Sequence, residues 1–324
     1  MKDPYNMFID ENVYLTKIKY YERMFETKRI FFEYLQDGKS LEEFQKETER
    51  IWKGIDHTFM KKQISKLEEM IKQRDLKDRQ IINPNAEHKE VYKLVPESDF
   101  RKREEIYKKN IDKYFKGREQ TLEKDYIDKQ SYLTNIVEKY DDMQQTIPYF
   151  KKDGSVHSYH NIASYSSMLY NTNLTRAGWN RTMYDANLLG EDLLYLPAHT
   201  FACPMCQSWQ GKVYSKSGKR GKINGVPYDS KEDAINGGVG HPNCRHQWLI
   251  YWDSEMLQDN TYDSEEWTEK YKTKQKLRAI KLEISKLEND VSIYKTIGNQ
   301  EMVDTTESKI KKLNEVADQL QLSL

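Results

Sequence analysis

The chain has 324 residues, and its 52 basic and 52 acidic side chains give a formal net charge of zero. Charged residues make up 32% of the sequence and apolar residues 37%, and the mean hydropathy is −0.94. This balance gives no bulk electrostatic argument for nucleic-acid binding, and so polar a composition excludes one large compact core. Because aromatic and aliphatic residues recur throughout, the composition predicts long exposed helices with narrow apolar seams rather than disorder.

No apolar run approaches the roughly 18 residues that a membrane span needs. The first residues, Met1-Lys2-Asp3-Pro4-Tyr5, lack the apolar core of a signal peptide. We therefore expect a protein without a membrane span that is made in, and stays soluble in, a cytoplasm.

Residues 1–150 are expected to form a helical arm or bundle. Ser40 and Glu43 form a capping box, and the helix predicted after it carries one apolar stripe: Leu41, Phe44, Ile51, Trp52, Met60, Ile64, Leu67 and Ile71. Asn83-Pro84-Asn85 is a turn signal. Ser98 opens a second long helix, which we expect to end before Pro148. The spacing of three and four predicts helix–helix packing.

Residues 151–262 have the composition of a small α+β domain. A loop is predicted at 151–154 and a helix at 155–187. Short strands are predicted at Leu193–Pro197, Lys212–Tyr214 and Gln247–Tyr251. Three tryptophans are expected in the core of this domain: Trp209, Trp248 and Trp252.

Residues 263–324 are expected to form a helical hairpin or coiled coil. Apolar residues step by three and four at Leu277, Ile280, Ile284, Leu287, Val291 and Tyr294. After a break at Gly298-Asn299, the spacing resumes at Val303, Thr306, Ile310, Leu313, Ala317 and Leu320. The predicted fold class is mainly α, with long helices and coiled-coil-like hairpins flanking a small Cys/His domain of zinc type.

All three cysteines lie in one segment, which argues against a disulfide framework and for a metal or redox site. Cys203 and Cys206 form one Cys-x-x-Cys pair, and His241 and Cys244 form a His-x-x-Cys pair. Two such turns suit a tetrahedral ion, and sulfur with imidazole selects zinc. We therefore predict a structural zinc site at Cys203, Cys206, His241 and Cys244, with His246 as the alternative fourth ligand and His199 as a further competitor.

Two other interpretations of this segment are a reduced cysteine cluster in a small core and a redox Cys-x-x-Cys. Catalytic zinc is disfavoured, because no glutamate lies beside His241 and four ligands leave no open position. No catalytic residue is therefore expected. A zinc-dependent enzyme or toxin would have to use Asp192, His199, His241 or His246.

Four basic residues lie in the loop between the two ligand pairs: Lys216, Lys219, Arg220 and Lys222. They could contact phosphate, as in a DNA-binding module, or form a solvated loop tip. Arg245, beside the second ligand pair, is expected to pair with a carboxylate or to cap the site.

Three sequence stretches resemble the C-terminal signature of phage minor capsid proteins. They are Cys203-x-x-Cys206, Gln210-Gly211-Lys212-Val213-Tyr214-Ser215, and Gly238 to His246. The resemblance is closest to the minor capsid protein 2 type, and looser to head-morphogenesis proteins of the phage Mu type. It covers about residues 155–252 and includes a preceding helix rich in Asn and Arg, with Asn173, Arg176, Asn180 and Arg181.

The resemblance implies a structural protein of a tailed-phage head, present in several copies per virion. It implies the portal protein or the major capsid protein as partners, and contact with packaged DNA. The implied location is the capsid interior or the portal vertex, after synthesis in the host bacterial cytoplasm.

Overall fold

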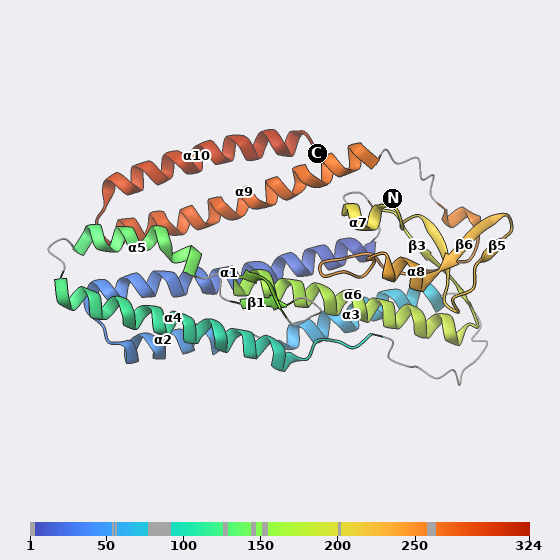
Figure 1. Cartoon of the computed structure of the whole chain (residues 1–324), viewed down its shortest axis with the longest axis horizontal. Coiled ribbons are helices and arrows are strands. Elements are labelled where there is room, and N and C mark those ends of the chain that lie inside the picture. The colour runs from blue at the N-terminus through green and yellow to red at the C-terminus, as the bar shows by residue number, and fades with distance from the viewer. Residues whose placement is uncertain are drawn as a thin grey trace. The chain divides into compact units, whose positions relative to one another are not determined.

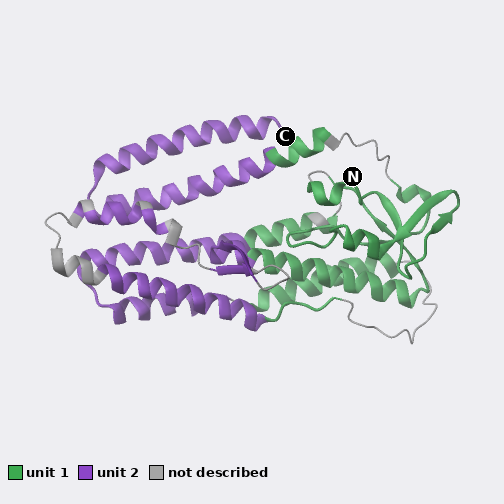
Figure 2. Ribbon diagram, in the orientation of Figure 1, with its two compact units in different colours: residues 1–15, 57–96, 167–272 green, residues 16–56, 97–166, 273–324 purple. Residues whose placement is uncertain are grey.

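The computed structural model describes residues 4–53, 55, 57–76, 92–125, 129–143, 147–150, 155–199, 202–257 and 264–324. The chain forms two compact units, each assembled from three separate stretches (Figure 2). Unit 1 comprises residues 1–15, 57–96 and 167–272, and unit 2 comprises residues 16–56, 97–166 and 273–324. The three consecutive segments expected from composition are a different division, and they stay a prediction.

Unit 1 is built on a five-stranded sheet of order β5-β6-β4-β3-β7 (Figure 1). Its strands are β3 (Leu193–Leu196), β4 (Lys212–Ser215), β5 (Gly221–Ile223), β6 (Val226–Ser230) and β7 (Leu249–Ile250). Strand β3 is antiparallel to β4 and β7, β4 is parallel to β6, and β5 is antiparallel to β6. The helices of unit 1 are α3 (Thr58–Leu76), α7 (Pro204–Gln207), α8 (Lys231–Asn236), the 3-10 helix η1 (Ser254–Met256), and parts of α1 (Pro4–Asp37), α6 (Ile162–Leu188) and α9 (Ser264–Thr296).

The core of unit 1 lies between α6 and one face of the sheet. Alternate residues of a strand point to opposite faces. Leu194 and Leu196 therefore join the core with Trp248 and with the α6 residues Trp179 and Met183. The other face carries Tyr195, Val213 and Tyr251. Trp248 is fully buried, and Trp209 and Trp252 pack against this core, which confirms their predicted role.

The sequence analysis missed β5, β6 and α8, although local signals for them exist. Asn224 and Gly225 have φ angles of +50° and +82° and connect β5 to β6. Asn-Gly is the dipeptide that two-residue hairpin turns favour. Ser230 caps α8, because its side chain accepts a hydrogen bond from the Glu232 N–H.

Unit 2 is mostly helical. It contains α2 (Leu41–Lys53), α4 (Glu97–Asp125), α5 (Lys129–Met143), α10 (Gln300–Leu322), parts of α1, α6 and α9, and an antiparallel hairpin of β1 (Ile147–Phe150) and β2 (Val156–His160). The capping box at α2 is confirmed. Ser40 Oγ accepts from the Glu43 N–H at 3.3 Å, and the Glu43 carboxylate accepts from the Ser40 N–H at 2.9 Å.

Phe31 of α1 is the centre of an aromatic core in unit 2. Its ring centroid lies 5.0–5.9 Å from those of Phe32, Phe44, Tyr114, Phe115 and Tyr140, which come from α1, α2, α4 and α5. Aromatic pairs at this separation stabilise the fold by more than the burial of their apolar surface alone. The apolar stripes of these helices therefore bury against one another, as their spacing predicts.

Helices α9 and α10 form the helical hairpin expected at the C-terminus (Figure 1). They are joined through Gly298, which has a φ of +75°, and Asn299, whose side chain caps α10. Ion pairs Lys295–Glu307 and Glu283–Lys309 connect the two helices. Most of the predicted seam is buried, including the polar Thr306 at 6% exposure. Supercoiling of this hairpin stays a prediction.

Three expected helix boundaries were wrong. The helix expected at 155–187 begins at Ile162, because Val156–His160 pair with β1. The helix expected from Ser98 to Pro148 is two helices, and Pro148 lies in β1. The single stripe from Leu41 to Ile71 belongs to α2 and α3. The spacing of apolar residues can continue from one helix into the next, so it does not show where one helix ends. The turns expected at 83–85 and 151–154 lie outside the described residues.

Within the part of the chain that the structure describes, no helix combines the length and the apolar character that crossing a membrane requires. The mainly α fold class with a small Cys/His sheet region is confirmed.

Candidate metal centre

The first pair of cysteines lies at the start of the short helix α7. Cys203 is its N-cap residue and Pro204 occupies the first turn, where the missing N–H costs nothing. The Cys203 carbonyl accepts from the Cys206 N–H at 2.9 Å. This turn places both sulfur atoms on one side of the loop, with Cys206 buried and Cys203 half-buried.

The second loop runs from Gly238 to His246 and depends on left-handed backbone. Gly238, Gly240 and Asn243 have φ angles of +112°, +89° and +68°. A Cβ atom on Gly240 would lie 2.6 Å from the Trp179 ring, so glycine is required there both for φ and for space. The Cys244 N–H donates to the His241 carbonyl at 2.8 Å, which closes the His-x-x-Cys turn.

The two loops bring all the predicted ligands together. Cys203 Sγ lies 3.0 Å from His241 Nε2, and Cys206 Sγ lies 3.9 Å from Cys244 Sγ. Cys244 Sγ lies 3.7 Å from His246 Nδ1. Among the described residues, two groups have ligand atoms within 4.8 Å of one another: Cys203, Cys206 and His241, and Cys206, Cys244 and His246. Cys206 belongs to both groups.

The three thiols share their protons unequally. Hydrogen bonding from Cys206 lowers the pKa of Cys203 and of Cys244, and the same contacts raise the pKa of Cys206. The hydrogen bond to Cys203 raises the pKa of His241 to about 9. The contacts with Cys206 therefore favour the thiolate form of Cys203 and of Cys244 and disfavour that of Cys206. A dication would stabilise ionisation of the third.

Helix α6 holds the second loop through hydrogen bonds to backbone carbonyls. Asn171 Nδ2 and Thr175 Oγ1 both donate to the Cys244 carbonyl, at 3.0 and 2.9 Å. Trp179 Nε1 donates to the His246 carbonyl at 2.7 Å. Arg245 forms the expected ion pair with a carboxylate, that of Asp10. The loop carrying Cys244 is thus fixed by a helix distant in sequence.

Gln210 is a site residue that the sequence analysis named only as part of the signature. It is 5% exposed, and its Oε1 accepts from the His199 N–H at 3.2 Å and lies 3.0 Å from His246 Nε2. The His199 and His246 rings lie against each other, with centroids 4.1 Å apart. His199 therefore contacts His246 rather than joining either group of ligand atoms.

Comparison with known families gives a match to this chain. Residues 136–320, more than half of the chain, match the sequence profile described as phage minor capsid protein 2. The chain belongs to the phage minor capsid protein 2 family. Searches of curated proteins and of solved structures gave no match.

Membership of this family assigns a structural role in a phage head and confirms the resemblance noted in the sequence. The matched region includes both Cys/His loops, α6 and most of the C-terminal hairpin. The family is structural rather than enzymatic, and its members are associated with the capsid of the virion.

The Asn- and Arg-rich face of α6 binds an extended backbone segment. Asn173 and Asn180 each accept from one backbone N–H and donate to the carbonyl of the same residue, at Val95 and Tyr92 respectively. Arg176 donates to the Lys93 carbonyl at 2.7 Å. These family-signature residues therefore have a structural function within unit 1.

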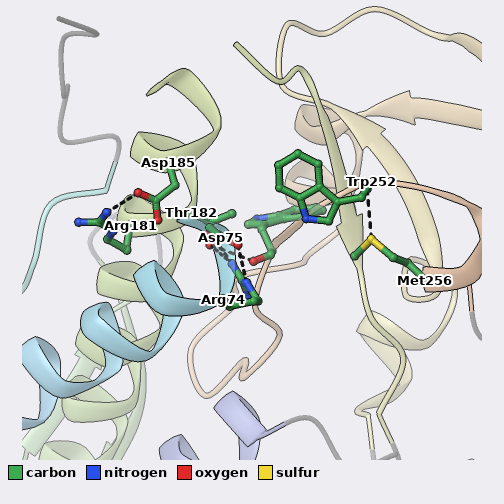
Figure 3. Close-up of polar contacts among 8 residues, drawn as sticks. Arg74, Asp75, Arg181, Thr182, Asp185, Trp252 and Met256 are labelled. Atoms are coloured by element: carbon green, nitrogen blue, oxygen red, sulfur yellow. Dashed lines mark hydrogen bonds and ion pairs between the residues drawn. The ribbon is translucent and has the colours of Figure 1, made fainter. Parts of the chain in front are cut away.

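A second polar cluster joins α6 to α3 (Figure 3). Arg181 pairs with the buried Asp185, and Arg74 makes a two-point contact with the buried Asp75, at 2.5 and 2.7 Å. Arg74 also donates to Thr182 Oγ1 at 3.2 Å. Burial raises the pKa of Asp185 to about 6, and Arg181 opposes that rise.

The remaining candidate residues are Asp192, which directly precedes β3, and four basic residues between the end of β4 and the end of β5. The Asp192 carboxylate accepts from the Ser217 N–H and Oγ at 2.7 Å, so it anchors the loop after β4. Arg220 pairs with Asp233 at 2.7 Å, and Lys216 donates to Asn187 Oδ1 at 2.5 Å. Lys219 and Lys222 are exposed. Phosphate contact by Lys216, Lys219, Arg220 and Lys222 stays a prediction.

Proposed function

We propose that this minor capsid protein binds the portal protein or the inner face of the major capsid protein. The observation that carries the proposal is a family match that takes in both the Cys/His domain and the C-terminal hairpin. In this proposal the Cys/His domain and the long helices are the docking surfaces.

The C-terminal hairpin offers apolar surface for such a partner. In the distal half of α10, Ile310, Leu313 and Leu320 are only half-buried, and Val316 and Leu322 are exposed at 42% and 89%. Exposed large apolar residues grouped on one element are typical of protein interaction sites. We therefore place the partner contact on α10.

Cross-linking of purified virions tests the location. Amine-reactive cross-links are expected from Lys309, Lys311 or Lys312 of α10 to the portal protein or to the major capsid protein. Cross-links to tail proteins alone, or a virion without this chain, would contradict the proposal.

We further propose that one structural zinc ion closes the small domain, bound by Cys203, Cys206, Cys244 and one of His241 and His246. Three sulfurs with imidazole suit zinc rather than magnesium or calcium. A metal bound by both loops would join α7 to the loop that α6 holds, and its binding would add folding free energy.

Elemental analysis of protein purified without chelator tests the metal. About one zinc per chain is expected. A chain that contains no zinc and still has a folded sheet, as judged by the near-ultraviolet signal of Trp179 and Trp248, would contradict this part of the proposal.

A further inference from the structure

Two histidines lie beside the three thiols, and the structure distinguishes their roles. We propose that His246, rather than His241, is the nitrogen ligand of the metal, and that Gln210 is the positioning residue that orients His246. This assignment rests on the proposed zinc site. It revises the sequence-based preference for His241.

Gln210 fixes the tautomer of His246. Because Gln210 Oε1 accepts from the His199 N–H, the amide oxygen rather than the amide nitrogen faces this side, 3.0 Å from His246 Nε2. An oxygen acceptor requires a proton on Nε2, which leaves the lone pair on Nδ1. That atom lies 3.7 Å from Cys244 Sγ. A metal-binding histidine usually donates its second N–H to such an oxygen.

The distances within the group of Cys206, Cys244 and His246 also suit a tetrahedral metal, and Cys203 reaches this group through its neighbour Cys206. Zinc bonds of about 2.3 Å to sulfur and about 2.0 Å to nitrogen place tetrahedral ligand atoms about 3.5–3.8 Å apart. The separation of Cys206 Sγ from Cys244 Sγ is 3.9 Å, and that of Cys244 Sγ from His246 Nδ1 is 3.7 Å. The 3.0 Å between His241 Nε2 and Cys203 Sγ is shorter and matches a direct hydrogen bond.

The surroundings of the two rings agree with this division. His246 is 2% exposed, lies against His199, and has its backbone carbonyl held by Trp179. His241 is half-buried, and its Nδ1 lies 2.6 Å from the Pro242 carbonyl, an acceptor for its N–H. The Pro242 carbonyl orients the His241 ring as Gln210 orients His246, so the tautomers alone do not separate the two rings. We place His241 outside the ligand set because of its greater exposure and its 3.0 Å contact with Cys203 Sγ.

Cobalt spectroscopy of the full-length chain tests the assignment, because the visible bands of cobalt report the ligand set. The wild type is expected to give a spectrum of three sulfurs and one nitrogen. His246→Cys adds a fourth thiolate and is expected to raise the sulfur-to-cobalt charge-transfer intensity about 1.3-fold. His241→Cys is the matched control and is expected to leave that intensity unchanged.

An intensity increase in His241→Cys alone, or in both variants, would overturn the assignment while leaving the zinc site intact. A wild-type chain that binds neither cobalt nor zinc would overturn the zinc proposal as well. The two failures are therefore distinguishable.

The positioning role of Gln210 has its own measurement, zinc affinity by chelator competition. Gln210→Leu removes the acceptor and is expected to weaken zinc binding about 10–100-fold. Gln210→Glu keeps an oxygen at the same place and is expected to restore most of the affinity. If both variants bind zinc as tightly as the wild type, or if Glu fails to rescue, Gln210 does not orient the ligand.

Discussion

Gly240 combines a special backbone angle with a close neighbour. Its φ is +89°, and a Cβ atom would lie 2.6 Å from the Trp179 ring. Gly190 has a similar φ of +71° but nothing within 4 Å. Both Gly→Ala variants should lose about 1 kcal/mol to backbone strain. Gly240→Ala should lose about 1–3 kcal/mol more, because the loop must also move away from Trp179.

Urea unfolding followed by tryptophan fluorescence measures this difference. Equal losses in Gly240→Ala and Gly190→Ala would show that the contact with Trp179 does not constrain the ligand loop.

The buried carboxyl group of Asp185 makes the stability of the fold depend on pH. Its pKa is raised by burial to about 6 in the folded chain, above the ordinary 3.8, so its ionised form opposes folding. The loss in free energy of unfolding is therefore largest above about pH 6, and it disappears as the pH falls from 6 towards 4. Asp185→Asn removes the titration, so the variant should gain stability relative to the wild type as the pH rises through 6.

Urea midpoints of wild type and Asp185→Asn at pH 5 and pH 7.5 check this sign. A difference between the two proteins that does not change with pH, or that changes in the opposite direction, would contradict it.

At the scale of single residues, the sequence identifies the proposed metal ligands better than the residues that position them. Cys203, Cys206 and Cys244 stand out because they are the only cysteines and recur at metal-ligand spacing. Gln210 and Thr175 do not stand out, because their roles depend on which loop backbone the fold brings within hydrogen-bond distance. The choice between His241 and His246 likewise depends on burial and on distances between side-chain atoms, which spacing does not encode.

Helix α6 is the element that holds the second Cys/His loop, from Gly238 to His246. Thr175→Val removes the hydrogen bond to the Cys244 carbonyl and should cost about 1 kcal/mol. Thr172→Val is a matched control one turn away, because the Thr172 hydroxyl bonds to Met168 of its own helix. Thermal unfolding compares the two. Equal losses would show that the contact with the loop contributes nothing measurable.

Helix α9 is joined to α1 in unit 2 by an ion pair whose lysine is buried. Lys28 is 1% exposed, and its Nζ lies 2.6 Å from Asp290, whose side chain is 13% exposed. Lys28→Met leaves the Asp290 carboxylate without its cation and should cost about 3–5 kcal/mol. Replacing Asp290 with Leu as well should recover much of that loss.

The exposed pair Lys295–Glu307 provides the control, since Lys295→Met should change stability by less than about 1 kcal/mol. A Lys28→Met variant as stable as Lys295→Met in urea unfolding would contradict the account of α9.

Helix starts and ends were predictable where a short local sequence pattern determines them. The capping box at Ser40 and the break at Gly298-Asn299 are local, and both were confirmed. The β1–β2 hairpin was missed because Pro148 looks like a helix stop and Val156–His160 mix exposed apolar and polar residues. A two-stranded hairpin buries too little surface to require a regular alternation of apolar and polar residues.

At the scale of the whole molecule, composition predicted helices with narrow seams but not how distant stretches combine. Each compact unit draws on three stretches of chain, and the family match contains residues of both units. Such long-range assembly is decided by packing between elements, which one sequence does not display. The family's shared region is therefore more than the Cys/His domain.

Cryo-electron microscopy of the portal vertex of intact virions tests the central claim most directly. The proposal predicts density for the α9–α10 hairpin against the portal or the inner capsid surface, with metal density between the two Cys/His loops. A head in which these surfaces carry no density for this chain would contradict the proposed function.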